Sequence, residues 1–139
     1  MKILTKDQAK KIITLATSRL ADYTKKDKLK SYVLGISGGI DSSVVGIIGL
    51  LSSEEIKSQG YNIGIHYYFL KCDSNKSDLH RAQLLAKKFN FRLKEIDLTN
   101  WFKTSPLLLT IPKGHSKTKI AKGNIKCRLR MITLYHFAQ

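Results

Sequence analysis

The sequence predicts an α/β fold in which a parallel sheet is flanked by helices, and three observations indicate it. Segments with the apolar spacing of amphipathic helices alternate with short segments rich in aromatic and β-branched residues. One short segment, at residues 31–36, is an apolar run typical of a strand buried on both faces. A glycine pair, Gly38 and Gly39, separates this run from the next helical segment. Because strands and helices alternate, the sheet should be parallel, with right-handed crossovers.

The first helix is expected at residues 5–23. Thr5 and Gln8 fit a capping box, in which a hydroxyl and an amide satisfy the first backbone N–H groups of a helix. The apolar side chains that follow at helical spacing are Ile12, Ile13, Leu15, Ala16 and Leu20. This helix is therefore expected to pack through its apolar face, and a polar stretch at residues 24–30 leads to the first strand.

The next elements alternate between helix and strand. A helix is expected at residues 42–52, where Gly46 and Gly49 lower the helix propensity but allow close approach to a neighbouring element. A second strand is expected at residues 61–70. Ser77 is a candidate N-cap for a helix at residues 78–89, and a third strand follows at residues 91–98.

The remainder of the chain is predicted to end in one more helix. A short helix is expected around Trp101 and Phe102, whose side chains we interpret as core or interface residues. The basic, glycine-containing segment 112–123 is expected to be mobile. Asn124 should cap the last helix, at residues 125–138, where Lys126, Arg128 and Arg130 would form a basic face with Arg128 early in the helix.

Length and composition indicate a single domain. A chain of 139 residues with 42% hydrophobic residues can bury a core of its own. No apolar run approaches the roughly 20 residues of a membrane span, and the N-terminus lacks the features of a signal peptide. Cys72 and Cys127 form neither a close metal pair nor a secreted disulfide framework, so we expect reduced thiols and a cytoplasmic location.

The chain is strongly basic. Its formal net charge is +15, from 25 Lys and Arg against 10 Asp and Glu, and such an excess attracts polyanions. The basic residues are spread along the chain, however, and nucleotide substrates are themselves anionic. We therefore do not expect specific nucleic-acid binding.

The turn after the first strand carries the clearest functional signal. Its sequence is Ser37-Gly38-Gly39-Ile40-Asp41-Ser42-Ser43. Two glycines can expose backbone N–H groups at the start of a helix, where an anion is favoured, and Asp41 could hold a metal that accompanies a phosphate. The alternative is a tight turn in which Asp41 or Ser42 caps the helix. The length and order of the motif favour a phosphate site, although it is neither a Walker loop nor a dinucleotide fingerprint.

Two separated motifs resemble one protein family. The turn is similar to the loop of N-type ATP pyrophosphatases, and Gly123-Asn124-Ile125-Lys126-Cys127-Arg128-Leu129-Arg130-Met131 resembles a segment of the ammonia-dependent NAD⁺ synthetases in that group. Residues 78–86 between them also resemble the helix after the family's second strand. The resemblance implies an adenine-nucleotide alpha-hydrolase-like (Rossmann-like) fold. It covers only the N-terminal half of a typical member, so residues 1–139 are expected to be one partial, truncated domain.

The resemblance also implies roles for individual residues. The expected ATP-binding residues are Gly35, Ile36, Ser37, Gly38, Gly39, Ile40, Asp41 and Ser42. Asp41 would in addition hold Mg²⁺, and Arg128 would bind deamido-NAD⁺. The implied reaction is the ATP-dependent amidation of deamido-NAD⁺ by ammonia through an adenylate, releasing AMP and pyrophosphate. The family also implies a homodimer, with the last helix near the subunit interface.

Two alternatives to this function stay open. The chain could be a related ATP pyrophosphatase that acts on tRNA or on another acid, which the charge of +15 would suit. It could also be a non-catalytic remnant that associates with a partner, because a partial domain would expose apolar surface.

The sequence departs from the family pattern at Cys127, where the family usually has Ala, and at Lys71, in a loop that usually contains proline and arginine.

Overall fold

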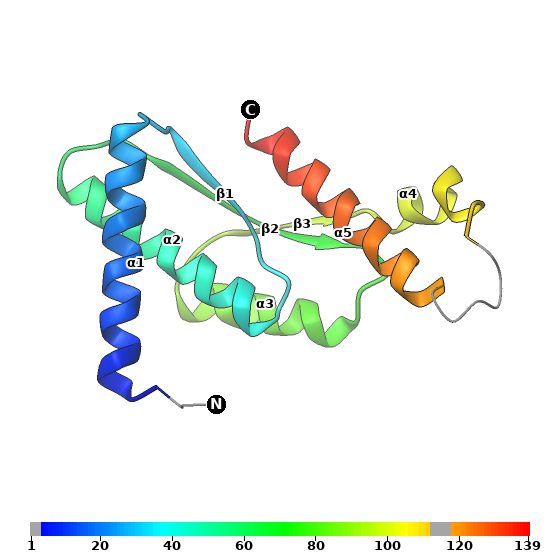
Figure 1. Cartoon of the computed structure of the whole chain (residues 1–139), viewed down its shortest axis with the longest axis horizontal. Helices are drawn as coiled ribbons and strands as arrows, with labels where there is room; N and C mark the ends of the chain where they lie inside the picture. Colours follow the sequence, from blue (N-terminus) through cyan, green and yellow to red (C-terminus); the bar gives the residue numbers. More distant parts are fainter. Residues whose placement is uncertain (1–3, 112–117) are drawn as a thin grey trace.

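A computed structural model describes residues 4–111 and 118–139 as a three-stranded sheet with helices on both faces (Figure 1). The elements in chain order are α1 (Lys6–Lys26), β1 (Ser31–Gly35), α2 (Ile40–Ser58), β2 (Gly64–Lys71), α3 (Lys76–Lys88), β3 (Leu93–Asp97), α4 (Thr99–Thr104), the 3₁₀ turn η1 (Pro106–Leu108) and α5 (Thr118–Phe137). The predicted alternation of helix and strand is confirmed.

All strand pairs in the sheet are parallel, as predicted, and the order is β1-β2-β3. The register places Gly35 beside Tyr68 and Lys71 beside Asp97. The carboxyl ends of the strands therefore meet at one edge, which is where ligands bind in open sheets of this kind.

Alternate side chains of the strands build a core on each face. Tyr67 and Phe69 of β2 face α2 and α3, in a cluster with Ile36 and Ala82. Tyr68 and Leu70 point to the other face and pack with side chains of α4 and α5, such as Phe102. The sheet is thus the middle of three layers, and α1 packs against α2 from outside.

Two glycines of α2 permit the close approach that the sequence suggested. A Cβ at Gly46 would lie 2.7 Å from Cδ1 of Ile36, and one at Gly49 would lie 2.7 Å from Cδ1 of Leu34. A Cβ at either position would force the tip of Ile36 or Leu34, or α2 itself, to shift. The two glycines therefore allow α2, and with it the turn before α2, to lie close to the sheet.

The apolar face predicted for the first helix is confirmed only at its C-terminal end, where Leu20 packs against a core cluster. The capping box at Thr5 and Gln8 is confirmed. Ile12 and Leu15 are each 52% exposed, and the buried side chains of α1 are Thr17, Ala21 and Thr24. The N-terminal half of α1 extends beyond the sheet, so only its C-terminal half meets other elements (Figure 1). Small residues are favoured there because they let the helix lie close to α2 and β1.

Several predicted ends and caps also differ from the structure. The α3 helix is capped by Asn75 instead of Ser77, and α2 continues to Ser58. The last helix begins at Thr118, so Asn124 lies inside it and is not its cap. A helix tolerates Gly123 at a cost of about 1 kcal/mol, which the packing of α5 on the core can offset. Residues 118–123 are therefore helical, and the rest of the segment predicted to be mobile lies outside the described residues.

Of the aromatic pair in α4, Phe102 is buried and Trp101 is 53% exposed, so only Phe102 is a core residue. Within the described part of the chain, the structure contains no helix with the length and apolar character that crossing a membrane requires.

Candidate functional site

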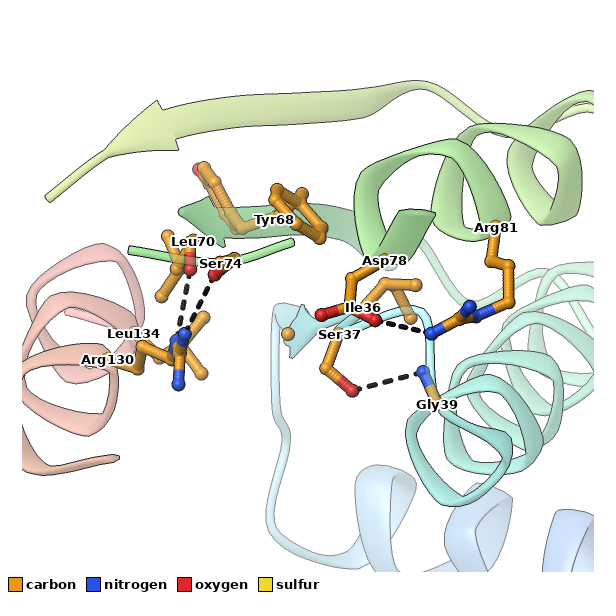
Figure 2. A pocket seen from close by; sticks show the side chains of 12 residues that line it. Ile36, Ser37, Gly39, Tyr68, Leu70, Ser74, Asp78, Arg81, Arg130 and Leu134 are labelled. Atoms are coloured by element: carbon orange, nitrogen blue, oxygen red, sulfur yellow. Dashed lines mark hydrogen bonds and ion pairs between the residues drawn. The ribbon is translucent and has the colours of Figure 1, made fainter. Parts of the chain in front are cut away.

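A cavity of about 380 Å³ opens at the carboxyl edge of the sheet, between the turn after β1, the end of β2, α3 and α5 (Figure 2). The residues that line it are Gly35, Ile36, Ser37, Gly39, Tyr68, Phe69, Leu70, Ser74, Asp78, Arg81, Arg130 and Leu134. Its volume is within the range of small-molecule sites, and its polar groups converge on an apolar floor, as such sites do.

The turn between β1 and α2 depends on Gly38. Its φ of +81° lies in the left-handed region that side chains disfavour. A Cβ at this position would lie only 2.1 Å from the backbone carbonyl oxygen of Asp78 in α3. Gly38 is therefore required twice, for the path of the turn and for the contact between the turn and α3.

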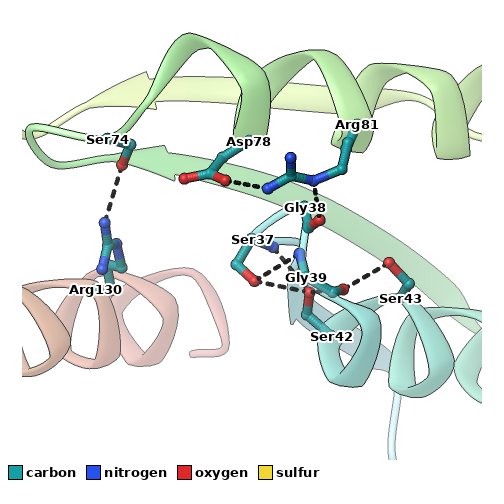
Figure 3. Close-up of polar contacts among 9 residues, drawn as sticks. All are labelled: Ser37, Gly38, Gly39, Ser42, Ser43, Ser74, Asp78, Arg81 and Arg130. Atoms are coloured by element: carbon teal, nitrogen blue, oxygen red, sulfur yellow. Dashed lines mark hydrogen bonds and ion pairs between the residues drawn. The ribbon is translucent and has the colours of Figure 1, made fainter.

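Serine hydroxyls hold the turn from inside. Ser42 Oγ accepts a hydrogen bond from the Ser37 N–H at 3.0 Å and lies 2.9 Å from Ser37 Oγ (Figure 3). Both Ser42 and Ser43 donate their hydroxyl protons to the carbonyl oxygen of Gly39, at 3.1 and 2.8 Å. The hydroxyl of Ser42 is thus already engaged in shaping the turn.

The N-terminus of α2 carries no side-chain cap. Its N-cap residue is Gly39, so the alternative in which Asp41 or Ser42 caps this helix was wrong. An uncapped helix start presents backbone N–H groups and the positive end of the helix dipole. Together with the exposed glycine backbone, this end of α2 is suited to bind an anion.

Arg81 of α3 ties the turn to its neighbour. Its Nε donates to the carbonyl oxygen of Gly38 at 2.9 Å, and a terminal nitrogen pairs with the Asp78 carboxylate (Figure 3). The Asp78 carboxylate offsets the positive charge of Arg81. Arg81 therefore contributes to the site by fixing the orientation of the Gly38 carbonyl.

Arg130 supplies positive charge on the opposite wall. It donates to the carbonyl oxygen of Leu70 and to Ser74 Oγ, each at 3.0 Å, and lies across the cavity from Ser37 (Figure 2). Both acceptors are neutral, so these bonds position the guanidinium without cancelling its charge. Nearby, Lys126 donates to Asp73 at 2.7 Å, and this hydrogen bond lowers the pKa of the Asp73 carboxyl. The loop after β2 is therefore fixed to α5 at several points.

Comparison with known proteins identifies the family. A family model described as NAD synthase matches residues 12–139. The chain belongs to the NAD synthase family. Among curated relatives, it is 36% identical over 121 residues to an NH(3)-dependent NAD(+) synthetase of Mycoplasma genitalium, covering 86% of this chain and 45% of the relative. A protein of the same name from Finegoldia magna is 36% identical over 124 residues, covering 88% and 46%.

Solved structures share the fold. An NAD⁺ synthetase from Burkholderia pseudomallei superposes with a TM-score of 0.80 at 26% identity, over 94% of this chain and 57% of that one. An NMN synthetase from Francisella tularensis has a TM-score of 0.74 at 24% identity, a likeness that concerns the fold alone. The predicted Rossmann-like α/β class is confirmed, and the chain spans about half the length of the relatives it matches.

The structure brings together part of the ATP-binding set that the NAD synthase resemblance implied. Gly35, Ile36, Ser37 and Gly39 line the cavity. The other predicted members do not line it: Gly38 is buried against α3, Ile40 is 82% exposed, Asp41 is exposed in the first turn of α2, and Ser42 holds the turn.

Arg128 is exposed and does not line this cavity. The basic face predicted for α5 was wrong, because Lys126 and Arg130 are four residues apart and share a side, whereas Arg128 lies two residues from each. Arg128 also lies in the middle of α5 instead of near its start, so the helix dipole gives no reason for an anion there.

Sequence reasoning missed four polar residues of the cavity: Ser74, Asp78, Arg81 and Arg130. A signal for Arg130 was present in the spacing of four residues from Lys126, which places both on one side of a helix. Ser74 also had a signal, because the loop after β2 is expected at the same edge of a parallel sheet as the turn after β1. Asp78 and Arg81 had none, because their positions follow from how α3 meets that turn.

The described residues, 4–111 and 118–139, contain no group of three or more His, Cys, Asp or Glu side chains able to hold a metal ion. A Mg²⁺ ion that arrives on a nucleotide needs only one or two protein carboxylates, since phosphate oxygens and water supply its other ligands. Asp41, exposed beside the turn, fits that limited requirement.

Proposed function

We propose that this chain forms the ATP-binding portion of an ammonia-dependent NAD⁺ synthetase. The observation that carries the proposal is one cavity walled by an uncapped helix N-terminus and by Arg130, in a chain that matches the NAD synthase family over residues 12–139. The curated relatives are named NH(3)-dependent NAD(+) synthetases. Since the chain spans under half of their length, the complete reaction is proposed for the protein with the whole family length.

The chain's own residues would act by binding and positioning. Backbone N–H groups in the first turn of α2 would donate to phosphate oxygens, with Arg130 neutralising charge from the other wall. The Gly39 N–H already donates to Ser37 Oγ at 3.3 Å and shapes the turn. Hydrogen bonds from Ser42, Ser43 and Arg81 keep the turn in place without a ligand, so little reorganisation is needed on binding.

Asp41 would contribute one oxygen ligand to Mg²⁺ bound to the phosphates, since it lies in the first turn of the same helix. When bound, Mg²⁺ would supply charge neutralisation at the phosphates. The expected effect of Asp41→Asn is therefore specific: it should weaken binding of Mg²⁺-ATP and leave the weaker binding of metal-free ATP unchanged. Equal weakening of both would contradict the metal role.

The proposed reaction has two steps. The nicotinate carboxylate of deamido-NAD⁺ attacks the α-phosphorus of ATP, and pyrophosphate leaves. Ammonia then attacks the acyl carbon, AMP leaves, and a proton is released as the amide forms. Arg128 is the residue proposed to contact deamido-NAD⁺, because its guanidinium suits the phosphates of that substrate and is exposed on α5.

Calorimetric titration with Mg²⁺-ATP and a turnover assay together test this function. We expect saturable binding to one site per chain, weakened about tenfold in Arg130→Met through loss of a charge-assisted contact, with the exposed Lys119→Met as control. Turnover requires NAD⁺ and AMP to form in equal amounts, only with ATP, deamido-NAD⁺ and ammonia present. Binding without turnover would restrict the chain to nucleotide binding, whereas no binding would overturn the site itself.

A related ATP pyrophosphatase acting on tRNA is the second candidate, favoured by the net charge of +15. Non-specific binding of a basic chain to tRNA weakens steeply with salt. Tight, saturable tRNA binding that persists at high salt would favour this candidate over the first.

A further inference from the structure

Three helices end at the edge of the sheet that lies opposite the cavity. Each of α1, α2 and α3 leads directly into a strand, so their C-termini lie where β1, β2 and β3 begin (Figure 1). Lys25 of α1 donates to the side chain of Gln59, which follows α2, at 2.8 Å. The Gly64 N–H donates to the Lys30 carbonyl at 2.9 Å. These contacts join the connections before β1 and β2 at one edge, which we call the amino edge.

The amino edge carries basic side chains from all three helices and from the connections that follow them. Lysines in the last turn of a helix offset the negative end of its dipole, which accounts for those of α1, α2 and α3 one helix at a time. The dipoles do not account for Lys28 and Lys30 after α1 or for Arg92 after α3. The exposed basic residues of the amino edge are Lys26, Lys28, Lys30, Lys57, Lys87, Lys88 and Arg92.

Acidic neighbours do not neutralise these charges. At the carboxyl edge three acidic side chains each pair with a basic one, as Asp97 does with Lys71 at 2.7 Å. Among the described residues, none of the exposed basic residues of the amino edge forms an ion pair. Residues 79–94 contain no acidic residue, so the end of α3 and the start of β3 carry positive charge alone. The acidic residues in or directly after the last two turns of α1 and α2 are Asp22, Asp27, Glu54 and Glu55.

Aromatic rings are interspersed among these lysines. Lys30 Nζ lies 6.0 Å from the ring centroid of Tyr61, and Lys88 Nζ lies 5.8 Å from that of Phe89. Tyr23 is 55% exposed and Phe89 is 36% exposed. An exposed ring beside an ammonium group can stack on a base while the ammonium group contacts a phosphate. The last turns of α1, α2 and α3 present no exposed large aliphatic side chain, which disfavours a lipid surface as the partner.

We propose that the amino edge binds single-stranded nucleic acid without sequence preference, through its phosphates and the faces of its bases. Packed helices lie about 10 Å apart, so three helix ends give an edge of about 20 Å, which is long enough for several nucleotides. The amino edge lies opposite the cavity, so this binding is separate from ATP binding and from any use of tRNA as a substrate. The proposal rests on the fold and on the distribution of charge, and does not depend on the proposed function.

Fluorescence anisotropy of a labelled oligouridylate of about 15 nucleotides tests the proposal on the unaltered chain. We expect saturable binding with a Kd of about 1–100 μM at physiological salt. Contact with about five phosphates should give a slope of about −3.5 in log K against log salt concentration. Saturating Mg²⁺-ATP should leave the binding unchanged. No binding would overturn the proposal, and so would displacement by Mg²⁺-ATP, which would place the nucleic acid in the cavity.

Two matched variants separate the amino edge from net charge. Lys87→Gln with Lys88→Gln removes two exposed lysines from α3, and Lys10→Gln with Lys11→Gln removes two from the half of α1 that extends beyond the sheet. The first pair should weaken oligouridylate binding about tenfold and make the slope shallower by about 1.4. The second pair should change neither by more than about twofold in affinity, and both variants should bind Mg²⁺-ATP as the unaltered chain does. Equal losses in the two variants would show that net charge alone attracts the nucleic acid.

Phe89→Leu tests whether the bases take part. The substitution should weaken oligouridylate binding about fivefold or more and leave the binding of inorganic polyphosphate unchanged, because polyphosphate has no bases to stack. Unchanged oligouridylate binding would overturn the proposal and assign the edge to polyanions in general. Binding to vesicles that contain anionic lipid, lost when Lys87 and Lys88 are replaced and unaccompanied by oligouridylate binding, would assign it to a membrane instead. If Phe89→Leu does not fold, the matched lysine variants decide.

Discussion

Gly38 is the residue on which the turn after β1 most depends. Its φ of +81° is shared by Gly60, but only Gly38 is in contact with another element, since nothing lies within 4 Å of a Cβ at Gly60. Gly60→Ala should therefore cost only the left-handed penalty, about 1–2 kcal/mol. Gly38→Ala adds an overlap with the Asp78 carbonyl and should cost clearly more. Urea unfolding of both variants measures the difference, and equal losses would contradict the contact between the turn and α3.

Thr17 is the one buried polar side chain that lacks a hydrogen-bond partner in the described part of the chain. Thr17→Val keeps the shape and removes the unsatisfied hydroxyl, so the free energy of unfolding should rise by up to about 1 kcal/mol. Thr24 in the same helix is the control, because its hydroxyl bonds to the Leu20 carbonyl at 2.7 Å and to the Tyr32 hydroxyl at 2.5 Å. Thr24→Val should lower the free energy of unfolding by about 1–3 kcal/mol. If both variants change the free energy of unfolding in the same direction, the unsatisfied hydroxyl of Thr17 does not destabilise the fold.

Helix α5 holds the loop that follows β2 in place through Arg130 and Lys126. Arg130→Met removes two hydrogen bonds and leaves the Leu70 carbonyl without its donor, so unfolding should become easier by about 1–3 kcal/mol. Amide exchange should also accelerate in residues 72–75. Arg128→Met, an exposed change on the same helix, should stay within about 0.5 kcal/mol of the unaltered chain. Comparable effects of both substitutions would contradict the assigned role of Arg130.

The junction of β2, β3 and α4 gives the chain an acid-sensitive contact. Asp97 accepts hydrogen bonds from Lys71 at 2.7 Å and from the Thr99 N–H at 2.8 Å, and the bond from Lys71 is the main reason that the pKa of its carboxyl is well below the usual range. A lowered folded-state pKa stabilises the fold above the unfolded pKa of about 3.9, and this contribution is lost as the pH falls toward the folded value.

Asp97→Asn should therefore reduce the fall in stability below about pH 4. Lys71→Met should act in the same direction, because it removes the hydrogen bond that lowers the pKa of Asp97. Thermal unfolding between neutral pH and pH 2 measures the effect. An acid-induced loss of stability that is as steep in both variants as in the unaltered chain would show that this contact contributes nothing.

For the molecule as a whole, local patterns in the sequence predicted the parallel sheet and the position of the phosphate-type turn. The apolar run at residues 31–36 and the turn that follows it are adjacent in the chain, so both could be interpreted without knowledge of distant contacts. The start of α5 was predicted wrongly because a helix tolerates a single glycine at a cost of about 1 kcal/mol, so Gly123 does not mark its boundary. Arg81 and Asp78 join the cavity only through the docking of α3 on the turn, which no local pattern reports.

Within the described part of the chain, β1 pairs with β2 alone. Val33 was interpreted as part of a strand buried on both faces, and the structure leaves it half-buried, between two apolar cavities. The predicted homodimer stays a prediction, since the structure contains a single chain.

We propose that the cavity between the turn after β1 and Arg130 binds the phosphates of ATP. The most direct test is a titration of the chain with Mg²⁺-ATP followed by the NMR signals of backbone amides and arginine side chains. We expect saturable shifts concentrated at Ser37, Gly39, the first turn of α2 and Arg130, persisting at about 0.3 M salt, where exposed charges are largely screened. Shifts that never saturate, or that spread over the exposed lysines and disappear with salt, would contradict the claim.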